Sequence, residues 1–344
     1  MPKGSKAPLS IMNRNLGRSF ITQILPLPWP TDDFTGKTVI VTGANSGLGR
    51  EAARHFVRLN AQKVILGCRD PLKAISAKQD IESSERSSSC ELEIWPVDLG
   101  SFESVKSFCH RAAELERLDV VVENAGLLSH TYHQFEGYER QCTVNIISTW
   151  LMALLLLPTM RKTSAKFYNE RGEPGMPHLC VVGSNSQFYT NFKQRNEPLI
   201  FESLKGNEDM YHRYANTKLI SCLVMREVAK RMQDSGGAQV VLNMVEPGFC
   251  KSELLREGTW PWYFKVMMAV ANAVLARTPE MGSRTYIWAA CAGPQSHGVY
   301  VEDCMFSTPA PLVDTEEGRL LQVKVFRELA EILEVIVPNM TRNI

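Results

Sequence analysis

Near-continuous apolar runs, rich in valine and isoleucine, recur along the chain and predict the strands of a sheet. Runs of this kind are typical of parallel strands that are covered on both faces, because such strands leave no face for polar side chains. The predicted strands cover residues 38–42, 63–68, 91–97, 118–124, 179–184 and 240–245, with a short last one at 298–301.

Helix-like segments lie between these runs. In the first segment, Leu48, Ala52 and Phe56 recur at helical spacing and form one apolar stripe. This alternation implies right-handed βαβ units in a doubly wound, mostly parallel α/β sheet of about seven strands, with helices on both faces. Further helices are predicted near residues 71–84, 101–116, 135–158, 211–233 and 317–336.

We predict one domain over residues 34–344, preceded by an N-terminal arm over residues 1–33 that is rich in proline and basic residues. An insert near residues 249–296 is expected to form a substrate lid. Its most apolar stretch, Trp260 to Ala276, is interrupted by Lys265 and Asn272, which favours a buried or lid helix over a helix at a membrane surface. No run of about 18 apolar residues predicts a spanning helix.

Composition narrows the functional classes. Of the 344 residues, 44% are hydrophobic and 22% are charged. The net charge of +1 shows no basic excess of the kind that binds nucleic acid or an anionic membrane. The nine cysteines are scattered without a C-x-x-C pair, which favours reduced thiols in a cytoplasmic protein. Only His130 and His133 have ligand-like spacing, without a nearby acidic partner, so we expect no metal site.

The segment TGANSGLGR, which starts at Thr42, places three glycines between a predicted strand and a predicted helix. This context matches a dinucleotide fingerprint and hence a Rossmann fold. Gly43 permits the tight turn, Gly47 allows the backbone to approach a pyrophosphate, and Gly49 allows close packing of helix and strand. The helix N-terminus then offers N–H groups and a partial positive charge to the phosphates.

The end of the second strand bears on the choice of nicotinamide cofactor. Arg69 follows Gly49 by 20 residues, and its planar guanidinium matches a ribose 2′-phosphate. The adjacent Asp70 is either a ligand of the ribose hydroxyls or part of the first turn of the next helix. We favour NADP(H) over NAD(H).

The chain resembles the short-chain dehydrogenase/reductase family from about Phe34 to Tyr300. The family's sequence elements occur in order, and the stretch around the glycines is most similar to the NADP-dependent, retinol-dehydrogenase-like branch and, within it, to fungal proteins of secondary metabolism. The elements are TGANSGLG 42–49, VDL 97–99, NAG 124–126, VNI 144–146, VVGS 181–184, YANTK 214–218 and EPG 246–248.

Four residues are the catalytic candidates. Tyr214 and Lys218 are four residues apart, so they share one face of the predicted helix, and a nearby cation lowers a phenol pKa. Ser184 ends a predicted strand at the ligand-binding edge of the sheet, where its hydroxyl can donate to an oxyanion; Ser186 is its rival. The resemblance implies that Lys218 also binds the nicotinamide ribose, and that Asn145 holds a water that links Lys218 to solvent.

The resemblance also implies the cofactor-binding set. Asp98 and Leu99 would contact the adenine, and Pro247 and Gly248 would lie beside the nicotinamide. Cys250 and Ser252 replace the family's usual valine and threonine, and Ser252 keeps the hydroxyl for the nicotinamide amide. The complete set is Gly43, Asn45, Ser46, Gly47, Leu48, Gly49, Arg69, Asp98, Leu99, Asn124, Ala125, Gly126, Tyr214, Lys218, Pro247, Gly248 and Ser252.

The predicted activity is NADP(H)-dependent interconversion of a carbonyl and an alcohol, with ketone or aldehyde reduction as the expected direction. An extended-branch epimerase or dehydratase is an alternative, but such enzymes usually carry T-G-x-x-G-x-x-G. A non-enzymatic NADP-sensing protein is a second alternative, but such proteins commonly lose the four catalytic residues.

The substrate is expected to be a hydrophobic small molecule, because aromatic residues are frequent in the lid region. Candidates for the pocket rim also follow the NAG element, at His130, Tyr132 and His133. The resemblance implies a homodimer through the helices at 135–158 and 211–233, although the apolar residues 150–157 are equally compatible with burial against the sheet. The predicted lid residues are Trp260, Trp262, Tyr263, Phe264, Met267 and Met268.

Overall fold

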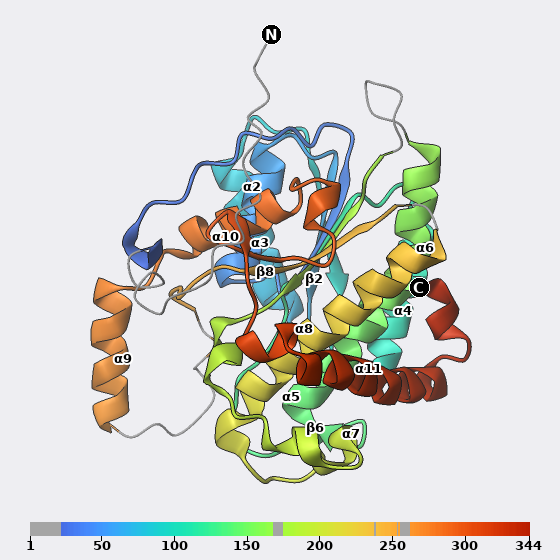
Figure 1. Ribbon diagram of the computed structural model, residues 1–344. Helices are drawn as coiled ribbons and strands as arrows, with labels where there is room; N and C mark the ends of the chain where they lie inside the picture. Colours follow the sequence, from blue (N-terminus) through green and yellow to red (C-terminus); the bar gives the residue numbers. More distant parts are fainter. Residues whose placement is uncertain (1–21, 168–174, 237–238, 253, 255–261) are drawn as a thin grey trace.

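The computed structural model describes residues 22–167, 175–236, 239–252, 254 and 262–344. Its central eight-stranded sheet has the order β10-β9-β8-β7-β4-β1-β2-β3, and all neighbouring pairs are parallel except β9 with β10 (Figure 1). The doubly wound Rossmann fold is therefore confirmed. The strands are β1 (Thr38–Thr42), β2 (Lys63–Cys68), β3 (Glu91–Pro96), β4 (Val120–Glu123), β7 (His178–Val182), β8 (Val241–Glu246), β9 (Tyr300–Glu302) and β10 (Met305–Ser307).

The eighth strand, β10, was not predicted. It pairs with β9 through a two-residue turn, in which Asp303 and Cys304 have φ angles of 53° and 56°. Two consecutive left-handed residues match the twist of a hairpin, a geometry usually signalled by Asn-Gly or Asp-Gly. Because Asp-Cys lacks this signal and β10 has only three residues, no sequence pattern indicated the strand.

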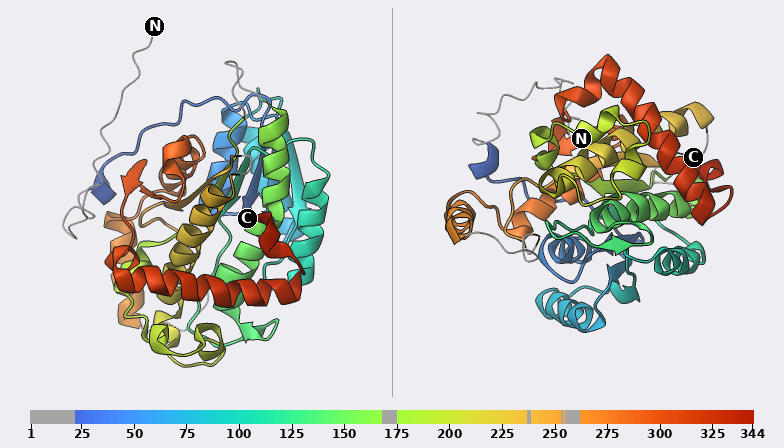
Figure 2. Two further views of the ribbon diagram at one scale, coloured as in Figure 1. Left: turned by 45° about the vertical axis from the view of Figure 1, so that its right-hand side comes forward. Right: turned by 90° about the horizontal axis from the view of Figure 1, so that it is seen from below.

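Helices cover both faces of the sheet (Figure 2). One face carries a core that includes Phe56, Ile81 and Tyr286, and the other carries the larger core around Trp150 and Leu223. The first face is covered by α2 (Gly47–Arg58), α3 (Pro71–Ser84) and α10 (Pro279–Ala289), and the second by α4 (Phe102–Ala113), α6 (Thr149–Lys166) and α8 (Met210–Ser235), with α11 (Glu316–Ile336) packed on α8. The shorter elements are α5 (Arg140–Cys142), α7 (Ile200–Ser203) and the 3-10 turns Asn185–Tyr189, Lys193–Asn196, Pro294–Ser296, Pro311–Asp314 and Met340–Asn343.

The helix predicted at 135–158 has different bounds in the structure. Its predicted start is occupied by a small hairpin of β5 (Gln134–Phe135) and β6 (Tyr138–Glu139), which turns at Glu136 and Gly137 with positive φ. Helical structure then runs from Arg140 to Lys166 and continues past Pro158. This stretch is long and apolar enough to span a membrane by composition, but 89% of its most apolar window is buried inside the protein.

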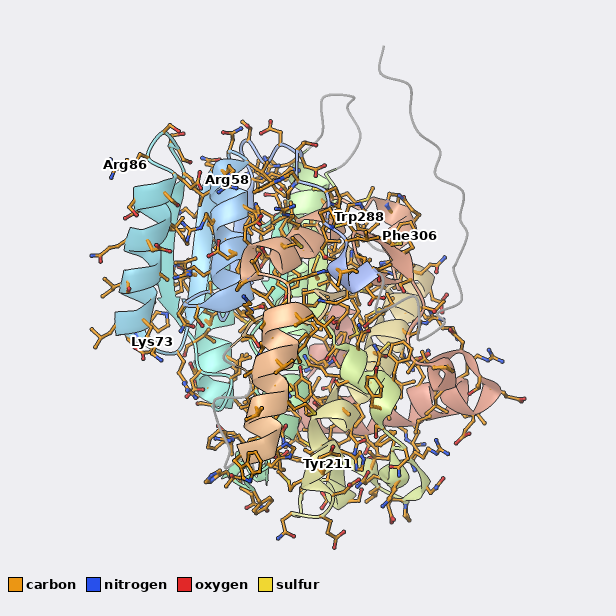
Figure 3. The ribbon with its side chains drawn as sticks, turned by 90° about the vertical axis from the view of Figure 1, so that its left-hand side faces the viewer. Arg58, Lys73, Arg86, Tyr211, Trp288 and Phe306 are labelled. Carbon is orange, nitrogen blue, oxygen red and sulfur yellow. The ribbon has the colours of Figure 1, made fainter. Side chains whose placement is uncertain are left out.

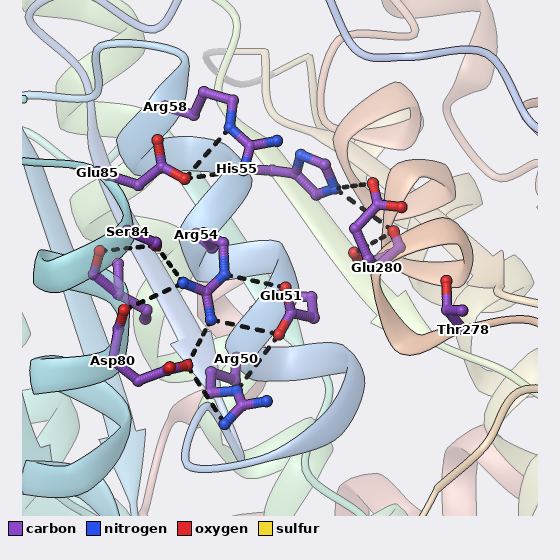
Figure 4. Close-up of polar contacts among 12 residues, drawn as sticks. Arg50, Glu51, Arg54, His55, Arg58, Asp80, Ser84, Glu85, Thr278 and Glu280 are labelled. Atoms are coloured by element: carbon purple, nitrogen blue, oxygen red, sulfur yellow. Dashed lines mark hydrogen bonds and ion pairs between the residues drawn. The ribbon is translucent and has the colours of Figure 1, made fainter.

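Polar contacts hold α2 between α3 and α10 (Figure 4). Arg54 Nη2 lies 2.5 Å from Asp80 Oδ2 on α3, and His55 Nε2 lies 3.1 Å from Glu280 Oε1 on α10. The apolar face of the same helix packs on the sheet through Ala52 and Phe56, which are fully buried. The glycine-rich turn before α2 is thus attached to a helix that is fixed on three sides.

The described part of the N-terminal arm lies along the domain surface beside α10. The indole of Trp29 stacks on Arg284 with 3.8 Å between the guanidinium carbon and the ring centroid, and Arg284 Nη1 donates to Leu27 O at 2.6 Å. On the neighbouring sheet edge, Trp288 contacts Phe306 of β10 edge to face (Figure 3). The arm is therefore attached to the core through α10.

Helix α9 (Trp262–Val274) stands out from the body at the left of Figure 1. Trp262 and Met267, two predicted lid residues, are 77% and 56% exposed. Trp260 lies outside the described residues, as do the side chains of Tyr263 and Phe264. The side chains of Trp262 and Met267 are therefore open to solvent in the structure described here, and the lid stays a prediction.

Candidate functional site

One cavity of about 720 Å³ opens at the carboxyl edge of the parallel strands. This edge is where doubly wound sheets bind ligands. Every residue of the predicted cofactor set lines it, as do Ser184, Tyr214 and Lys218. The structure thus brings together segments from Gly43 to Ser252; Asn145 is the one predicted site residue that lies behind the wall.

The three glycines of the β1–α2 turn have different physical reasons. A Cβ atom on Gly49 would lie 2.5 Å from both Gly43 O and Asn124 Nδ2, so this position packs too closely for any side chain. Gly43 adopts φ +65° and would bring a Cβ within 3.1 Å of Ala125 Cα. Gly47 has φ +54° with nothing within 4 Å of a Cβ, so its backbone faces open space in the cavity.

The N-terminus of α2 is suited to an anion. Ser46 occupies the N-cap position, but its side chain makes no capping hydrogen bond, and the first turn contains no acidic residue. The first backbone N–H groups of a helix need an external acceptor, and the helix dipole favours negative charge there. Together with the open backbone at Gly47, this arrangement fits the pyrophosphate of a dinucleotide.

The two candidates at the end of β2 both line the cavity but have different contacts. Asp70 is the N-cap of α3, and its Oδ1 accepts hydrogen bonds from Leu72 N at 3.1 Å and Lys73 N at 3.2 Å. Arg69 is exposed at the cavity wall, and Lys73 lines the same end. Asp70 therefore has a structural role in α3, and the cationic side chains Arg69 and Lys73 face this end of the cavity.

Tyr214, Lys218 and Ser184 meet at the centre of the cavity. Lys218 Nζ lies 5.7 Å from the centroid of the Tyr214 ring, one helical turn away on α8, and donates to Val182 O at 2.8 Å. The Tyr214 hydroxyl is hydrogen-bonded to Ser184. Ser184 Oγ also accepts from Ser186 N at 3.2 Å and caps a short 3-10 turn, whereas Ser186 Oγ has no partner among the described residues.

Burial dominates the titration of this pair. It raises the pKa of the Tyr214 phenol, and the hydrogen bond from Ser184 only partly offsets the shift. It lowers the pKa of Lys218 to about 8, against a favourable interaction with Glu246. The expected lowering of the Tyr214 pKa is therefore not seen in this structure, because loss of hydration outweighs the hydrogen bond from Ser184. That the charge of Lys218 lowers this pKa stays a prediction.

Asn145 holds the wall behind Lys218. It lies in a π-helical segment, Thr143–Ser148, where its amide is paired in both directions with the backbone of Leu127: Leu127 N donates to Oδ1 and Nδ2 donates to Leu127 O, both at 2.9 Å. A Cβ on Gly126 would come within 3.3 Å of Asn145 Oδ1 and 3.9 Å of Lys218 Nζ. Such π-bulges are frequent at functional sites, and sequence periodicity does not indicate them.

Several residues of the cavity wall were not predicted. Glu246 is 4% exposed at the end of β8, and its Oε1 accepts from Gly248 N at 3.1 Å. Its charge raises the pKa of both Tyr214 and Lys218. Gln23 of the arm also lines the wall. An acidic residue directly before Pro-Gly was visible in the sequence, whereas nothing there links Gln23 to the site.

The three residues predicted for the pocket rim are not in the lining of this cavity. His130 and Tyr132 do not line this cavity: the His130 ring stacks on Tyr211, and Tyr132 OH donates to Lys205 O at 2.8 Å. His133 does not line it either. Among the residues that the structure describes, no group of three or more His, Cys, Asp or Glu side chains is arranged to hold a metal ion.

Comparison with known proteins agrees with this geometry. Residues 37–166 match the family model described as short chain dehydrogenase. The chain is 37% identical over 328 residues to the short chain dehydrogenase/reductase dmxR8 of Cryptosporiopsis sp., covering 92% of this chain and 96% of that protein. It is 40% identical over 291 residues to the short chain dehydrogenase atnD of Emericella nidulans, covering 84% and 90%. The chain therefore belongs to the short-chain dehydrogenase/reductase family of oxidoreductases.

Solved structures share the fold. A short-chain dehydrogenase from Sphingobium yanoikuyae in complex with NADPH superposes with a TM-score of 0.55 at 18% identity, covering 77% of this chain and 87% of that one. A 3-oxoacyl (acyl-carrier-protein) reductase from Agrobacterium tumefaciens with NADP bound gives a TM-score of 0.56 at 20% identity, covering 78% and 93%.

The packing of Gly49 yields a stability prediction. Gly49→Ala is expected to reduce the free energy of unfolding by about 1–3 kcal/mol, because the added methyl meets backbone that cannot retreat. The matched control is Gly206→Ala, where nothing lies within 4 Å of a Cβ; its effect should stay within about 0.5 kcal/mol. Urea denaturation of both variants checks this, and equal effects would contradict the packing argument.

The buried amine of Lys218 yields a pH prediction. Burial lowers its pKa in the folded protein to about 8, from the ordinary value of 10.5. Below pH 8 the amine is charged in both states, so the full cost of burying that charge destabilises the folded protein. This cost fades as pH rises from 8 to 10.5, because the unfolded chain then loses the same proton. Without cofactor, Lys218→Met should be more stable than wild type at pH 7, by on the order of 1 kcal/mol, and the gain should shrink toward pH 10.5.

Denaturation at both pH values tests this prediction. The control is Lys230→Met, which removes an exposed lysine from the same helix and should show no such pH-dependent difference. A Lys218→Met stability difference that does not change between pH 7 and pH 10.5 would contradict the assignment.

Proposed function

We propose that this protein is an NADP(H)-dependent oxidoreductase that interconverts a carbonyl and an alcohol on a hydrophobic small molecule, chiefly as a ketone or aldehyde reductase. The observation that carries the proposal is the convergence of Tyr214, Lys218 and Ser184 in one cavity with the glycine-rich turn at Gly47. A proton donor, a cation and a hydroxyl donor thus lie beside a surface that fits a dinucleotide phosphate.

Each residue has a defined task in this reaction. Bound NADPH supplies a hydride to the carbonyl carbon. Ser184 donates a hydrogen bond to the carbonyl oxygen and fixes its position. Tyr214 donates its proton to that oxygen as the alcohol forms. Burial suits this role, because a raised pKa keeps the phenol protonated at neutral pH.

Lys218 and Asn145 support the proton donor. Lys218 would hold the nicotinamide ribose. The pKa of its amine, about 8, lies close to pH 7, so the amine can exchange a proton with solvent. Asn145 holds the loop at Leu127 in place behind Lys218 through its paired hydrogen bonds and supports the water through which Tyr214 is reprotonated.

The two ends of the cavity support the choice of cofactor and substrate. Arg69 provides a planar cation for a 2′-phosphate, whereas Asp70 caps α3 through Oδ1. Side chains with apolar surface also line the cavity and suit a hydrophobic substrate: Leu127, Leu128, Tyr189, Phe249, Leu254 and Leu275. We further propose that the enzyme acts in secondary metabolism, in the cytoplasm, and as a homodimer.

Cofactor choice is tested with Arg69→Ala. Loss of a charge-assisted hydrogen bond should weaken NADP(H) binding about 10–100-fold and leave NAD(H) binding unchanged, as measured by calorimetry. The control is Arg86→Ala, which removes an exposed arginine near the other end of α3 from Lys73 (Figure 3). A preference for NAD(H) that the mutation leaves untouched would assign the ribose contact to Asp70.

The proton donor is tested with Tyr214→Phe. With NADPH and a panel of hydrophobic ketones and aldehydes, kcat should fall about 10²–10⁴-fold, whereas the dissociation constant for NADPH should change little. Tyr211→Phe is the matched control, because Tyr211 lies on the same helix and is 76% exposed (Figure 3). Equal activity of the two variants would remove Tyr214 from the chemistry.

A further inference from the structure

The N-terminal arm binds the loop that follows β8. Gln23 Nε2 donates to Phe249 O at 2.7 Å, and Phe249 N donates to Gln23 Oε1 at 3.0 Å, although the two residues are 226 positions apart. The same Nε2 donates to Leu275 O at 2.9 Å. The side-chain amide of Gln23 therefore forms hydrogen bonds with both the N–H and the carbonyl of Phe249, as a neighbouring strand would. It also connects this loop to Leu275, directly after α9.

A buried arginine holds the arm in this position. Arg277 is 3% exposed; its Nη2 donates to Thr22 O at 2.7 Å, and its Nε donates to Gln23 O at 3.3 Å. Its Nη1 pairs with Asp303 at 2.6 Å and donates to Pro247 O at 3.3 Å. One guanidinium thus joins the arm, the loop after β8 and the β9–β10 turn.

The loop is shaped to receive this contact. Gly248 has φ +81°, and a Cβ at this position would lie 2.6 Å from Arg277 Nη1 and 2.8 Å from Gln23 Oε1. The position therefore excludes a side chain both by its backbone conformation and by the approach of these two groups. From the cavity side, Gln23, Gly248 and Phe249 all line the wall.

We propose that Gln23 is a positioning residue of the cavity. Its contacts with Phe249 and Leu275, together with those of Arg277 to the arm, are called the arm clasp here, and this clasp orders the loop Pro247–Cys250. The N-terminal arm is then part of the active site. The functional half of this inference rests on the proposed function, because it assigns Pro247 and Gly248 to the nicotinamide end. A loop that is ordered before the cofactor arrives loses less conformational entropy on binding. Without the clasp, part of the binding free energy is consumed in ordering the loop.

Hydrogen exchange on the cofactor-free protein tests the contact itself. Gln23→Met keeps the length of the side chain but removes all three hydrogen bonds. The Phe249 amide should then exchange about tenfold faster, the equivalent of one hydrogen bond. The control is Ile24→Ala, which removes a 64% exposed neighbouring side chain and should leave the exchange as in wild type. Unchanged exchange in Gln23→Met, or equal acceleration in Ile24→Ala, would overturn the clasp.

Cofactor binding tests its role. Gln23→Met should raise the dissociation constant for NADPH about 3–10-fold while the thermal midpoint of the cofactor-free protein stays near that of wild type. Gln23→Glu should raise the dissociation constant further, because it places carboxylate oxygens against Phe249 O and Leu275 O. Unchanged NADPH affinity in both variants would overturn the positioning role. If wild type itself binds neither NADP(H) nor NAD(H), the proposed function fails, while the exchange experiment still decides whether the clasp exists.

Discussion

The close approach of β1 and β4 at their carboxyl ends is the constraint on which the site depends. Asn124 Nδ2 donates to Thr42 O at 2.9 Å, and Ala125 N donates to Thr42 Oγ1 at 2.9 Å. This contact leaves room for no side chain at Gly49, and it determines where α2 begins. Tyr286 OH on α10 donates to Asn124 Oδ1 at 3.1 Å, so the same amide also fixes the helix that packs on α2. The open backbone at Gly47 is a consequence of this geometry.

Much of the fold and of the candidate site followed from local patterns. β1, β2 and α3 have the predicted bounds, because continuous apolar runs and an Asp-Pro start are strong signals. Most of the predicted cofactor residues share one cavity because they follow strands, and parallel strands present their carboxyl ends at one edge. Tyr214 and Lys218 reach the same cavity from α8.

The remaining features depend on contacts between distant parts of the chain. The π-helical turn at Asn145 is stabilised by pairing with Leu127 and Thr217, which no periodicity records. β10 exists only because it can pair with β9. The contact of Gln23 with Phe249 joins a polar residue of an irregular arm to an irregular loop, so neither side carries a pattern. Arg69 and Asp70 were both candidates in the sequence, and only the structure shows that Asp70 caps α3.

Burial disfavours the charged form of both Tyr214 and Lys218. It therefore raises the pKa of the tyrosine and lowers the pKa of the lysine. A phenol with a raised pKa next to an amine whose pKa is about 8 therefore forms a site with a neutral tyrosine and a lysine that is mostly cationic at pH 7. Glu246 raises both pKa values, which keeps the lysine cationic and the tyrosine protonated over a wider range. This state suits the proton donation to a developing alkoxide that we propose for Tyr214. The carbonyl reduction that we propose would use this state at the centre of the cavity and the cationic side chains of Arg69 and Lys73 at its cofactor end.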